Sequence, residues 1–185
     1  MTDRSTLAAL AARLDVLESE AEIRRIQSRY MFLCDTPCPE FAVRDDADRV
    51  DAVLDLYTDD AIWEGVGDYY ADQFGAVQGT AALRAHFERF WGTRTNPRLV
   101  LNAHYLTSEQ IHVDGDNASG QWIHMQPWLF ADGTGVLRSS RLNNRFRRDD
   151  GIWRVSRTRT ENVFVATLPT NFADSYARTT VLMDE

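Results

Sequence analysis

Apolar residues recur at helical spacing through the first part of the chain. Leucines at positions 7, 10, 14 and 17 predict a leading helix within residues 1–17, with an apolar face suited to packing on another subunit. The segment Ser19–Glu22 has the form of a capping box, so we expect a second helix to begin there and to end at Thr36-Pro37. The buried face of this second helix carries Ile23, Ile26, Gln27, Tyr30 and Leu33.

Turn-forming residues divide the middle of the chain into short pieces. We expect, in order, a loop over residues 36–48, a helix over 50–58, a strand over 61–64, an aromatic loop over 65–79 and a helix over 80–92. The aromatic loop contains Tyr69, Tyr70 and Phe74, which is typical of a segment that covers a pocket.

Predicted strands occupy most of the remaining chain. They run over residues 99–107, 110–113, 118–130, 135–148 and 152–166, and the last three are bounded by turns rich in Asp, Asn and Gly. Helices followed by an antiparallel sheet indicate an α+β domain in which a curved sheet wraps the helices and leaves a cavity between them. Residues 169–185 form a tail that is either a last helix or an extended arm.

Length and charge narrow the class of protein. At 185 residues the chain suits one domain, residues 1–185, and its 20 basic and 28 acidic residues give a net charge of −8. The basic residues are scattered, which disfavours nucleic acid as a partner. Cys34 and Cys38 lack a second pair at zinc spacing, and no apolar run reaches about 18 residues. We therefore expect no metal, no membrane span and a cytoplasmic location.

Two histidines lie in predicted strands. Period two places His104 on one face with Asn102 and Leu106, and His124 on one face with Trp122. A buried histidine suits proton transfer near neutral pH, although a histidine in a strand is also a common structural residue. His104 and His124 are therefore candidate catalytic residues.

Asp35 stands at the predicted C-terminus of a helix, where the helix dipole disfavours a carboxylate. It either makes an Asx-turn into Pro37 or serves a function. Arg157 and Arg159 share a period-two face with Trp153, which indicates an anion-binding pair or an outward ladder of ion pairs.

The two remaining histidines and a search for known nucleotide- and metal-binding motifs add no candidate site. His86 and His112 are predicted to be surface residues. The chain has no P-loop, GxGxxG, GxSxG, HExxH or EF-hand pattern. Acid/base chemistry without a cofactor is therefore the simplest enzymatic option.

Five segments follow one another in a characteristic order. They are Glu22–Tyr30 with Asp35, Leu56–Glu64, Gly79–Phe87, Ala103–Ser108 and Asp150–Val155. Together they resemble the SnoaL-like branch of the nuclear transport factor 2-like (NTF2-like) superfamily, which includes scytalone dehydratase, bile-acid 7α-dehydratase and polyketide cyclases. The resemblance covers residues 18–165 and implies a cone-shaped α+β fold with an internal pocket, but no particular reaction.

The resemblance also implies a site. Tyr30, Asp35 and His104 fall where dehydratases of this branch carry a tyrosine and an aspartate–histidine pair, and His124 resembles a second histidine. Arg157 or Arg159 resembles a strand arginine of the branch. The loops at 36–48 and 65–78 look longer than usual, and Asn143-Asn144-Arg145 departs from the usual pattern, which implies a different substrate.

The leading hypothesis is a cofactor-independent lyase acting on a hydrophobic, ring-containing small molecule. His104 would remove a proton next to a carbonyl, Asp35 would orient His104, and Tyr30 would polarise the carbonyl or assist the leaving group. The alternatives are a cyclase or isomerase with the same pair, and a non-catalytic binding or assembly subunit. The residues expected to bind substrate are Tyr57, Trp63, Tyr69, Tyr70, Phe74, Trp122, Trp128, Asn143 and Arg157.

A strongly curved sheet exposes an apolar convex face, which predicts a homo-oligomer. Leu101, Ala103, Ile123 and Met125, opposite the candidate histidines, are the expected interface residues. The resemblance favours a trimer and next a dimer.

Overall fold

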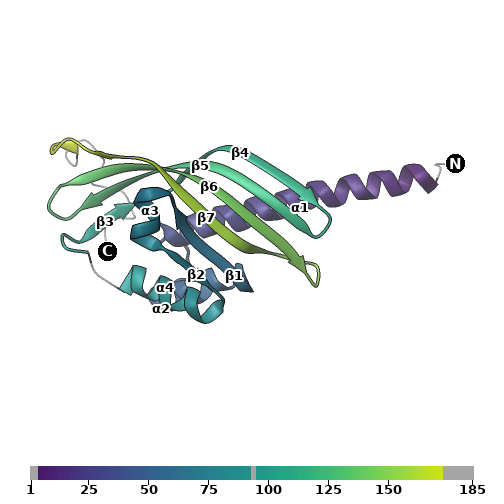
Figure 1. Ribbon diagram of the computed structural model, residues 1–185, viewed down its shortest axis with the longest axis horizontal. Coiled ribbons are helices and arrows are strands. Elements are labelled where there is room, and N and C mark those ends of the chain that lie inside the picture. The colour runs from purple at the N-terminus through teal and green to yellow at the C-terminus, as the bar shows by residue number, and fades with distance from the viewer. Residues whose placement is uncertain (1–3, 93–94, 173–185) are drawn as a thin grey trace.

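Helices cover one side of a curved sheet in the computed structural model, which describes residues 4–92 and 95–172 (Figure 1). Within the described residues the elements are α1 (Arg4–Cys34), α2 (Asp46–Leu54), β1 (Tyr57–Val66), α3 (Gly67–Phe74), β2 (Ala76–Gln78), α4 (Thr80–Gly92), β3 (Leu99–Asn102), β4 (Tyr105–Asp114), β5 (Asn117–Phe130), β6 (Gly135–Asp149) and β7 (Ile152–Thr167). The expected α+β cone is confirmed. Most of the predicted tail, residues 173–185, lies outside the described residues.

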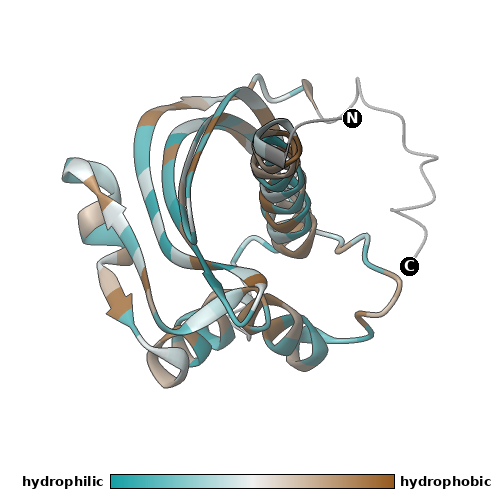
Figure 2. Cartoon of the chain, turned by 90° about the vertical axis from the view of Figure 1, so that its right-hand side faces the viewer, coloured by the Kyte–Doolittle hydropathy of each residue, from teal (hydrophilic) through white to brown (hydrophobic). Residues whose placement is uncertain are grey.

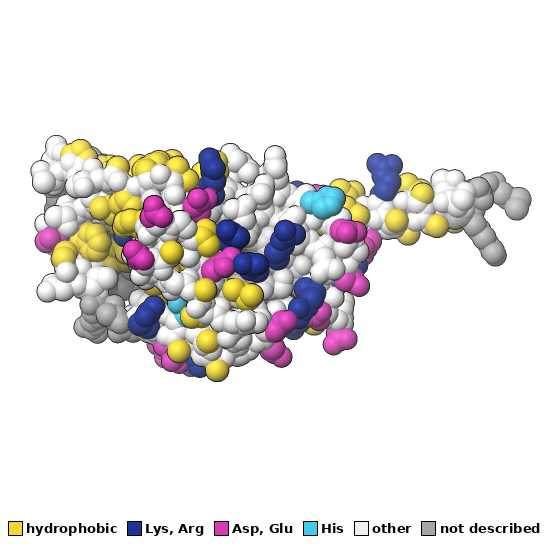
Figure 3. Space-filling view, in the orientation of Figure 1, with side chains coloured by type: hydrophobic (Ala, Val, Ile, Leu, Met, Phe, Trp, Pro, Cys, Tyr) yellow, Lys and Arg dark blue, Asp and Glu magenta, His cyan; other side chains and the backbone are white. Residues whose placement is uncertain are grey.

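The first helix is longer than the sequence pattern predicts. We expected a boundary at Ser19–Glu22, but α1 continues without a break from Arg4 to Cys34. Ser19 is 2% exposed, and its hydroxyl lies 3.5 Å from Arg148 on β6, so its side chain packs against the sheet instead of capping a helix. No Gly or Pro interrupts the segment, and Ala, Leu, Glu and Arg all favour helix. The first turns of α1 consequently project beyond the sheet (Figures 1 and 3).

The sheet is mixed but largely antiparallel. Its order is β2-β1-β7-β6-β5-β3, and β4 also pairs with β5. β1 pairs with β7 in parallel, whereas the other pairs are antiparallel. Seen from the end of the molecule, the strands curve around α1, and α2 and α4 lie below the opening (Figures 1 and 2). Among the described residues, no helix is both long and apolar enough to cross a membrane.

The middle of the chain is more regular than expected. α2 begins after its N-cap Asp45, whose carboxylate accepts the Asp48 amide hydrogen at 2.9 Å, and it ends three residues before β1. β1 extends well beyond the predicted strand at 61–64. The predicted aromatic loop at 65–79 contains α3 and β2, and Tyr70 on α3 is buried. The segment that was expected to cover the pocket is thus a short helix within its wall.

A β-bulge in β7 decides which side chains face the helices. Arg145 pairs with Arg157, but the next residue, Phe146, pairs with Val155, so Ser156 is an extra residue in β7. Val155 and Thr158 are both buried, although simple alternation would place them on opposite faces. The side chains that follow Ser156 therefore exchange faces.

Candidate active site

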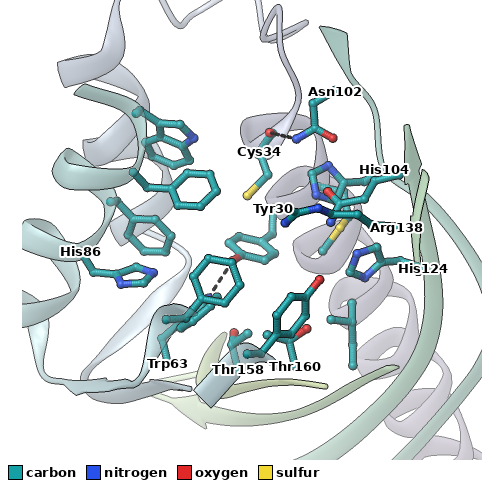
Figure 4. Close-up of a pocket in the computed structure, with 18 of the residues that line it drawn as sticks. Tyr30, Cys34, Trp63, His86, Asn102, His104, His124, Arg138, Thr158 and Thr160 are labelled. Atoms are coloured by element: carbon teal, nitrogen blue, oxygen red, sulfur yellow. Dashed lines mark hydrogen bonds between the residues drawn. The ribbon is translucent and has the colours of Figure 1, made fainter. Parts of the chain in front are cut away.

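A cavity lies between the concave face of the sheet and helices α1, α3 and α4 (Figure 4). It encloses about 670 Å³ that protein atoms leave free, including the space at its mouth. The residues that line it are Tyr30, Met31, Cys34, Trp63, Tyr70, Phe74, His86, Phe87, Phe90, Trp91, Asn102, His104, His124, Gln126, Trp128, Arg138, Leu142, Thr158 and Thr160. The wall is mainly aromatic, with a few polar groups directed inward, as is common for small-molecule sites.

Backbone pairing holds Asp35 beside His104. Immediately after α1, Thr36 and Asn102 exchange two backbone hydrogen bonds of 2.8 Å, which tie the end of α1 to the end of β3. The Asp35 carboxylate oxygen Oδ1 then accepts the His104 backbone N–H at 2.9 Å and lies 2.8 Å from His104 Nδ1. Asp35 therefore makes a contact across the fold, and not the Asx-turn that was its alternative.

A buried arginine supports this arrangement from behind. The Arg49 side chain is 7% exposed, and it donates hydrogen bonds to the backbone carbonyls of Leu33 and Asp35 at the end of α1. Its guanidinium stacks 4.3 Å from the Trp91 ring. A cation at this position compensates the negative end of the helix dipole and satisfies carbonyls that the helix leaves free. Arg49 thereby fixes the backbone that carries Asp35.

The Asp35 contact selects the tautomer of His104. An ionised carboxylate only accepts hydrogen bonds, so Nδ1 of a neutral His104 carries the hydrogen. The lone pair of the ring is then on Nε2, and the side chain lines the cavity. A partly buried carboxylate thus holds the His104 ring while the other ring nitrogen is left for the cavity.

Tyr30 supplies a hydroxyl to the same cavity. It is 6% exposed, and Trp63 Nε1 donates a hydrogen bond of 2.9 Å to its oxygen. Burial raises the pKa of Tyr30 well above its usual value, so the hydroxyl keeps its proton. The same hydroxyl also interacts with Tyr57 and with the thiol of Cys34, so a ligand would compete with these side chains for its hydrogen.

Two further histidines are buried and neutral. Burial, and then the nearby His104, lowers the pKa of His124 to about 3; its ring centroid is 5.4 Å from that of His104. Burial, and then Arg89, lowers the pKa of His86 to about 4; its ring lies 4.5 Å from Trp63. Neither nitrogen of His124, nor Nδ1 of His86, has a hydrogen-bond partner among the described residues. Both rings line the cavity as uncharged polar groups.

These histidines make the protein less stable in mild acid. Below pH 6.5 the unfolded chain protonates them while the folded chain does not, so stability is full above pH 6.5 and falls as the pH drops toward 4. We expect His86→Phe to reduce the loss of unfolding free energy between pH 6.5 and 4 by about 2 kcal/mol. Urea unfolding at several pH values measures this. The control is His112→Phe at an exposed histidine, and equal pH slopes in the two variants would contradict the expectation.

The structure brings together some of the predicted site residues and separates others. Tyr30, His104, His124, Trp63, Tyr70, Phe74 and Trp128 line the cavity, and Asp35 lies behind His104. Tyr57 is behind the wall, with its hydroxyl 2.7 Å from Thr158 Oγ1, and Tyr69 is 46% exposed. Trp122 packs on Phe146 away from the cavity, and Asn143 accepts a hydrogen bond from Gln121 on the outer face.

Arg157 and Arg159 also lie outside the cavity. Arg157 binds Glu64 of β1 with Nη2 at 2.6 Å, and Arg159 Nε is 3.7 Å from the same carboxylate oxygen. The extra residue Ser156 causes this, because it turns Thr158 and Thr160 inward in place of the two arginines. The outward ladder of ion pairs, which the sequence left open, is the observed arrangement.

His86 and Arg138 line the cavity although they were not predicted to do so. The expectation of a surface His86 is wrong, since the residue is 5% exposed. The signal was present, because His86 falls at helical spacing with Leu83 and Phe90. Arg138 similarly shares the period-two face of Leu142 and Phe146 in β6.

The cysteines and the possible metal ligands do not add a reactive group to the site. Cys34 and Cys38 are free, and burial raises the pKa of Cys34 to about 12, which makes it a poor nucleophile. Within residues 4–92 and 95–172, no three His, Cys, Asp or Glu side chains are grouped so that they could hold a metal ion.

Comparisons with known proteins agree with this architecture. The family model of the SnoaL-like domain matches residues 15–159. No curated protein matches the chain at a significant level. An NTF2-like protein with a cystatin-like fold from Novosphingobium aromaticivorans has a TM-score of 0.64 and 26% identity, over 88% of this chain and 92% of that one.

Two further solved structures have enzyme names. Hexachlorocyclohexane dehydrochlorinase LinA-type3 from Novosphingobium barchaimii has a TM-score of 0.61 and 18% identity, over 82% of this chain and 91% of that one. A candidate scytalone dehydratase from Novosphingobium aromaticivorans has a TM-score of 0.61 and 14% identity, over 81% of this chain and 87% of that one. At these identities the likeness concerns the fold.

Proposed function

The chain belongs to the SnoaL-like domain family, and on this premise we propose that it is a cofactor-independent lyase of the dehydratase type. The observation that carries the proposal is the pair Asp35–His104, joined at 2.8 Å and opening onto an apolar cavity that Tyr30 also lines. The substrate is a hydrophobic, ring-containing small molecule, which suits the aromatic wall. The solved structures named as a dehydrochlorinase and a candidate dehydratase lend support through their shared fold.

The proposed reaction needs only groups that this chain supplies. His104 Nε2 removes a proton from the carbon next to a carbonyl, and the carboxylate of Asp35 stabilises the resulting imidazolium. The electrons of the broken C–H bond form a C=C bond as the C–O bond to the neighbouring hydroxyl breaks. The imidazolium returns the proton to that hydroxyl, which leaves as water. Tyr30 donates a hydrogen bond to the carbonyl oxygen, where negative charge develops.

Proton abstraction is the step to test first, because a lyase and an isomerase share it. The purified protein is incubated in D₂O with a panel of ring-containing β-hydroxy ketones. Mass spectrometry then follows deuterium at the carbon next to the carbonyl and the appearance of a product lighter by one water. Loss of water supports the lyase, because the carbon that loses its proton joins the C=C bond and deuterium enters only recovered substrate, by reversal of the abstraction. Rearrangement without loss of water supports the isomerase. If neither occurs with any panel member, the proposal fails.

A non-catalytic assembly subunit is the alternative from a different class. Such a subunit has no need for an open cavity, and side chains would be expected to fill it. The cavity beside His104, with histidine, tyrosine and arginine side chains in its wall, supports the enzyme.

We further propose that the protein is a homo-oligomer, with a trimer favoured over a dimer. Ile123 and Met125 on the convex face are 38% and 42% exposed, and the register of β4 with β5 places Tyr105, 60% exposed, directly beside Met125. Leu101 and Ala103 are half-buried and contribute less. An apolar patch of this kind suits contact with a second copy of the chain.

The projecting part of α1 offers a second self-complementary surface. Leu7, Leu10, Leu14 and Leu17 are each more than half exposed, and their spacing is that of the a and d positions of a coiled coil (Figure 3). In a parallel pair of helices this register places Arg13 at g and Glu18 at e, so that each faces the opposite charge on the second copy.

Light scattering tests both surfaces. We expect a mass that is a multiple of 21.1 kDa for the wild type and a lower multiple for both Met125→Glu and Leu14→Glu. The matched control is Ala12→Glu, which adds the same charge to α1 on the side away from the leucines and should leave the mass unchanged. A wild-type mass of 21.1 kDa at all concentrations would refute the oligomer.

A further inference from the structure

One arginine in the cavity has no role in the proposed proton transfer. Arg138 lies on β6, where it pairs in register with Gln126 of β5. Two residues further along β6, Ser140 pairs with His124. Its guanidinium stacks 4.3 Å from the ring of Trp128. Figure 4 shows the side chain extending into the cavity from the wall that also carries His104 and His124.

The charge of Arg138 is not compensated within the described part of the chain. No carboxylate there forms an ion pair with it, and its Nε is buried without a hydrogen-bond partner. Arg141, three residues further along β6, also lacks an ion pair, but it is exposed to water. A guanidinium is always protonated, and a buried donor without an acceptor is costly. The position of Arg138 is therefore suited to a group that only a ligand brings.

The surroundings indicate the charge of that group. Every residue lining the cavity other than Arg138 is uncharged when the histidines are neutral, and the lining contains no Asp or Glu. Asp35 lies behind His104, and its Oδ1 accepts hydrogen bonds from that residue. An anionic ligand therefore meets a cation and an apolar wall without a competing negative charge.

We propose that the substrate carries a carboxylate that binds Arg138, while its ring packs against the aromatic wall formed by Trp63 and Phe74. A carboxylate fits because it accepts two parallel hydrogen bonds from the planar guanidinium fork, and stacking on Trp128 holds that fork in place. This proposal rests on the cavity being the substrate site. It narrows the substrate class from ring-containing molecules in general to ring-containing acids.

Binding of simple aromatic acids tests the proposal without any turnover. The probes are benzoate and 2-naphthoate, with benzamide and 2-naphthamide as uncharged counterparts of similar shape, measured by calorimetry. We expect each acid to bind about ten- to a hundredfold more tightly than its amide. Arg138→Met should lose this preference, because the methionine keeps the apolar stem without the charge. Arg138→Lys should keep part of it, and Arg141→Met, on the same strand, should keep all of it.

The outcomes separate this proposal from the lyase. Equal binding of acid and amide to the wild type, no binding of either acid, or an unchanged preference in folded Arg138→Met and Arg138→Gln would overturn the carboxylate site. Arg138-dependent binding without loss of water from any carboxylate-bearing β-hydroxy ketone would sink the lyase and leave the binding site standing.

Discussion

His104→Ala should reduce turnover by about 10²–10⁴-fold while the protein remains folded. The variant removes a cavity-lining imidazole that Asp35 orients, since His104 Nδ1 is 2.8 Å from the Asp35 carboxylate. Asp35→Asn should have a comparable effect, because an amide preserves the shape but does not stabilise the imidazolium. The measurement is the rate of deuterium uptake and water loss with the best substrate from the panel.

Thermal unfolding of the same variants supplies the control. Asp35 also accepts the backbone N–H of His104 at 2.9 Å, and the carbonyl oxygen of the asparagine is able to accept it in the same way. A modest change in melting temperature is therefore expected for Asp35→Asn. A variant that unfolds would show that Asp35 is chiefly structural. Full activity in a folded Asp35→Asn protein would leave His104 to act without the carboxylate.

Arg49→Met should lower the unfolding free energy by about 3 kcal/mol. The substitution leaves the carbonyls of Leu33 and Asp35 buried without a donor, and each such group costs about 1–3 kcal/mol. Release of the cation from its buried site offsets part of that cost. Activity should fall as well, because the backbone of Asp35 is no longer held. Denaturant unfolding and the deuterium assay measure the two effects.

Arg44→Met is the matched control for this prediction. Arg44 belongs to the same stretch of chain, but its side chain is 82% exposed and binds Asp48 at 2.7 Å on the surface. Exposed ion pairs typically contribute less than about 1 kcal/mol. If the two variants lost equal stability, the proposed support of α1 by Arg49 would be wrong.

Local periodicity was sufficient for the parts of the site that lie on regular elements. Tyr30 follows from the helical spacing of α1, and His124 from the period of two along β5. Asp35 and His104 lie just beyond the ends of α1 and β3, and only the tertiary pairing of Thr36 with Asn102 shows that their atoms meet. Sequence reasoning named both residues, but the distance between them depends on contacts far apart in the chain.

The errors arose where a local pattern competes with tertiary packing. A capping box at Ser19 is also compatible with the interior of a helix when the serine is buried against Arg148. The inward assignment of Arg157 and Arg159 assumed unbroken alternation, which Ser156 interrupts. A bulge residue of this kind is defined by how its strand pairs with the neighbouring strand. The identity of Ser156 alone therefore does not predict the bulge.

The extra residue in β7 also bears on how homologous chains diverge. Deletion of Ser156 would remove the bulge and place Arg157 directly after the inward-facing Val155, so that strict alternation would still turn Arg157 and Arg159 outward and Thr158 and Thr160 inward. A one-codon deletion would thus leave Thr158 and Thr160 in the cavity wall and Glu64 with both arginine partners on the outer face. In an alignment of family members, a gap at this position is therefore compatible with an unchanged cavity wall.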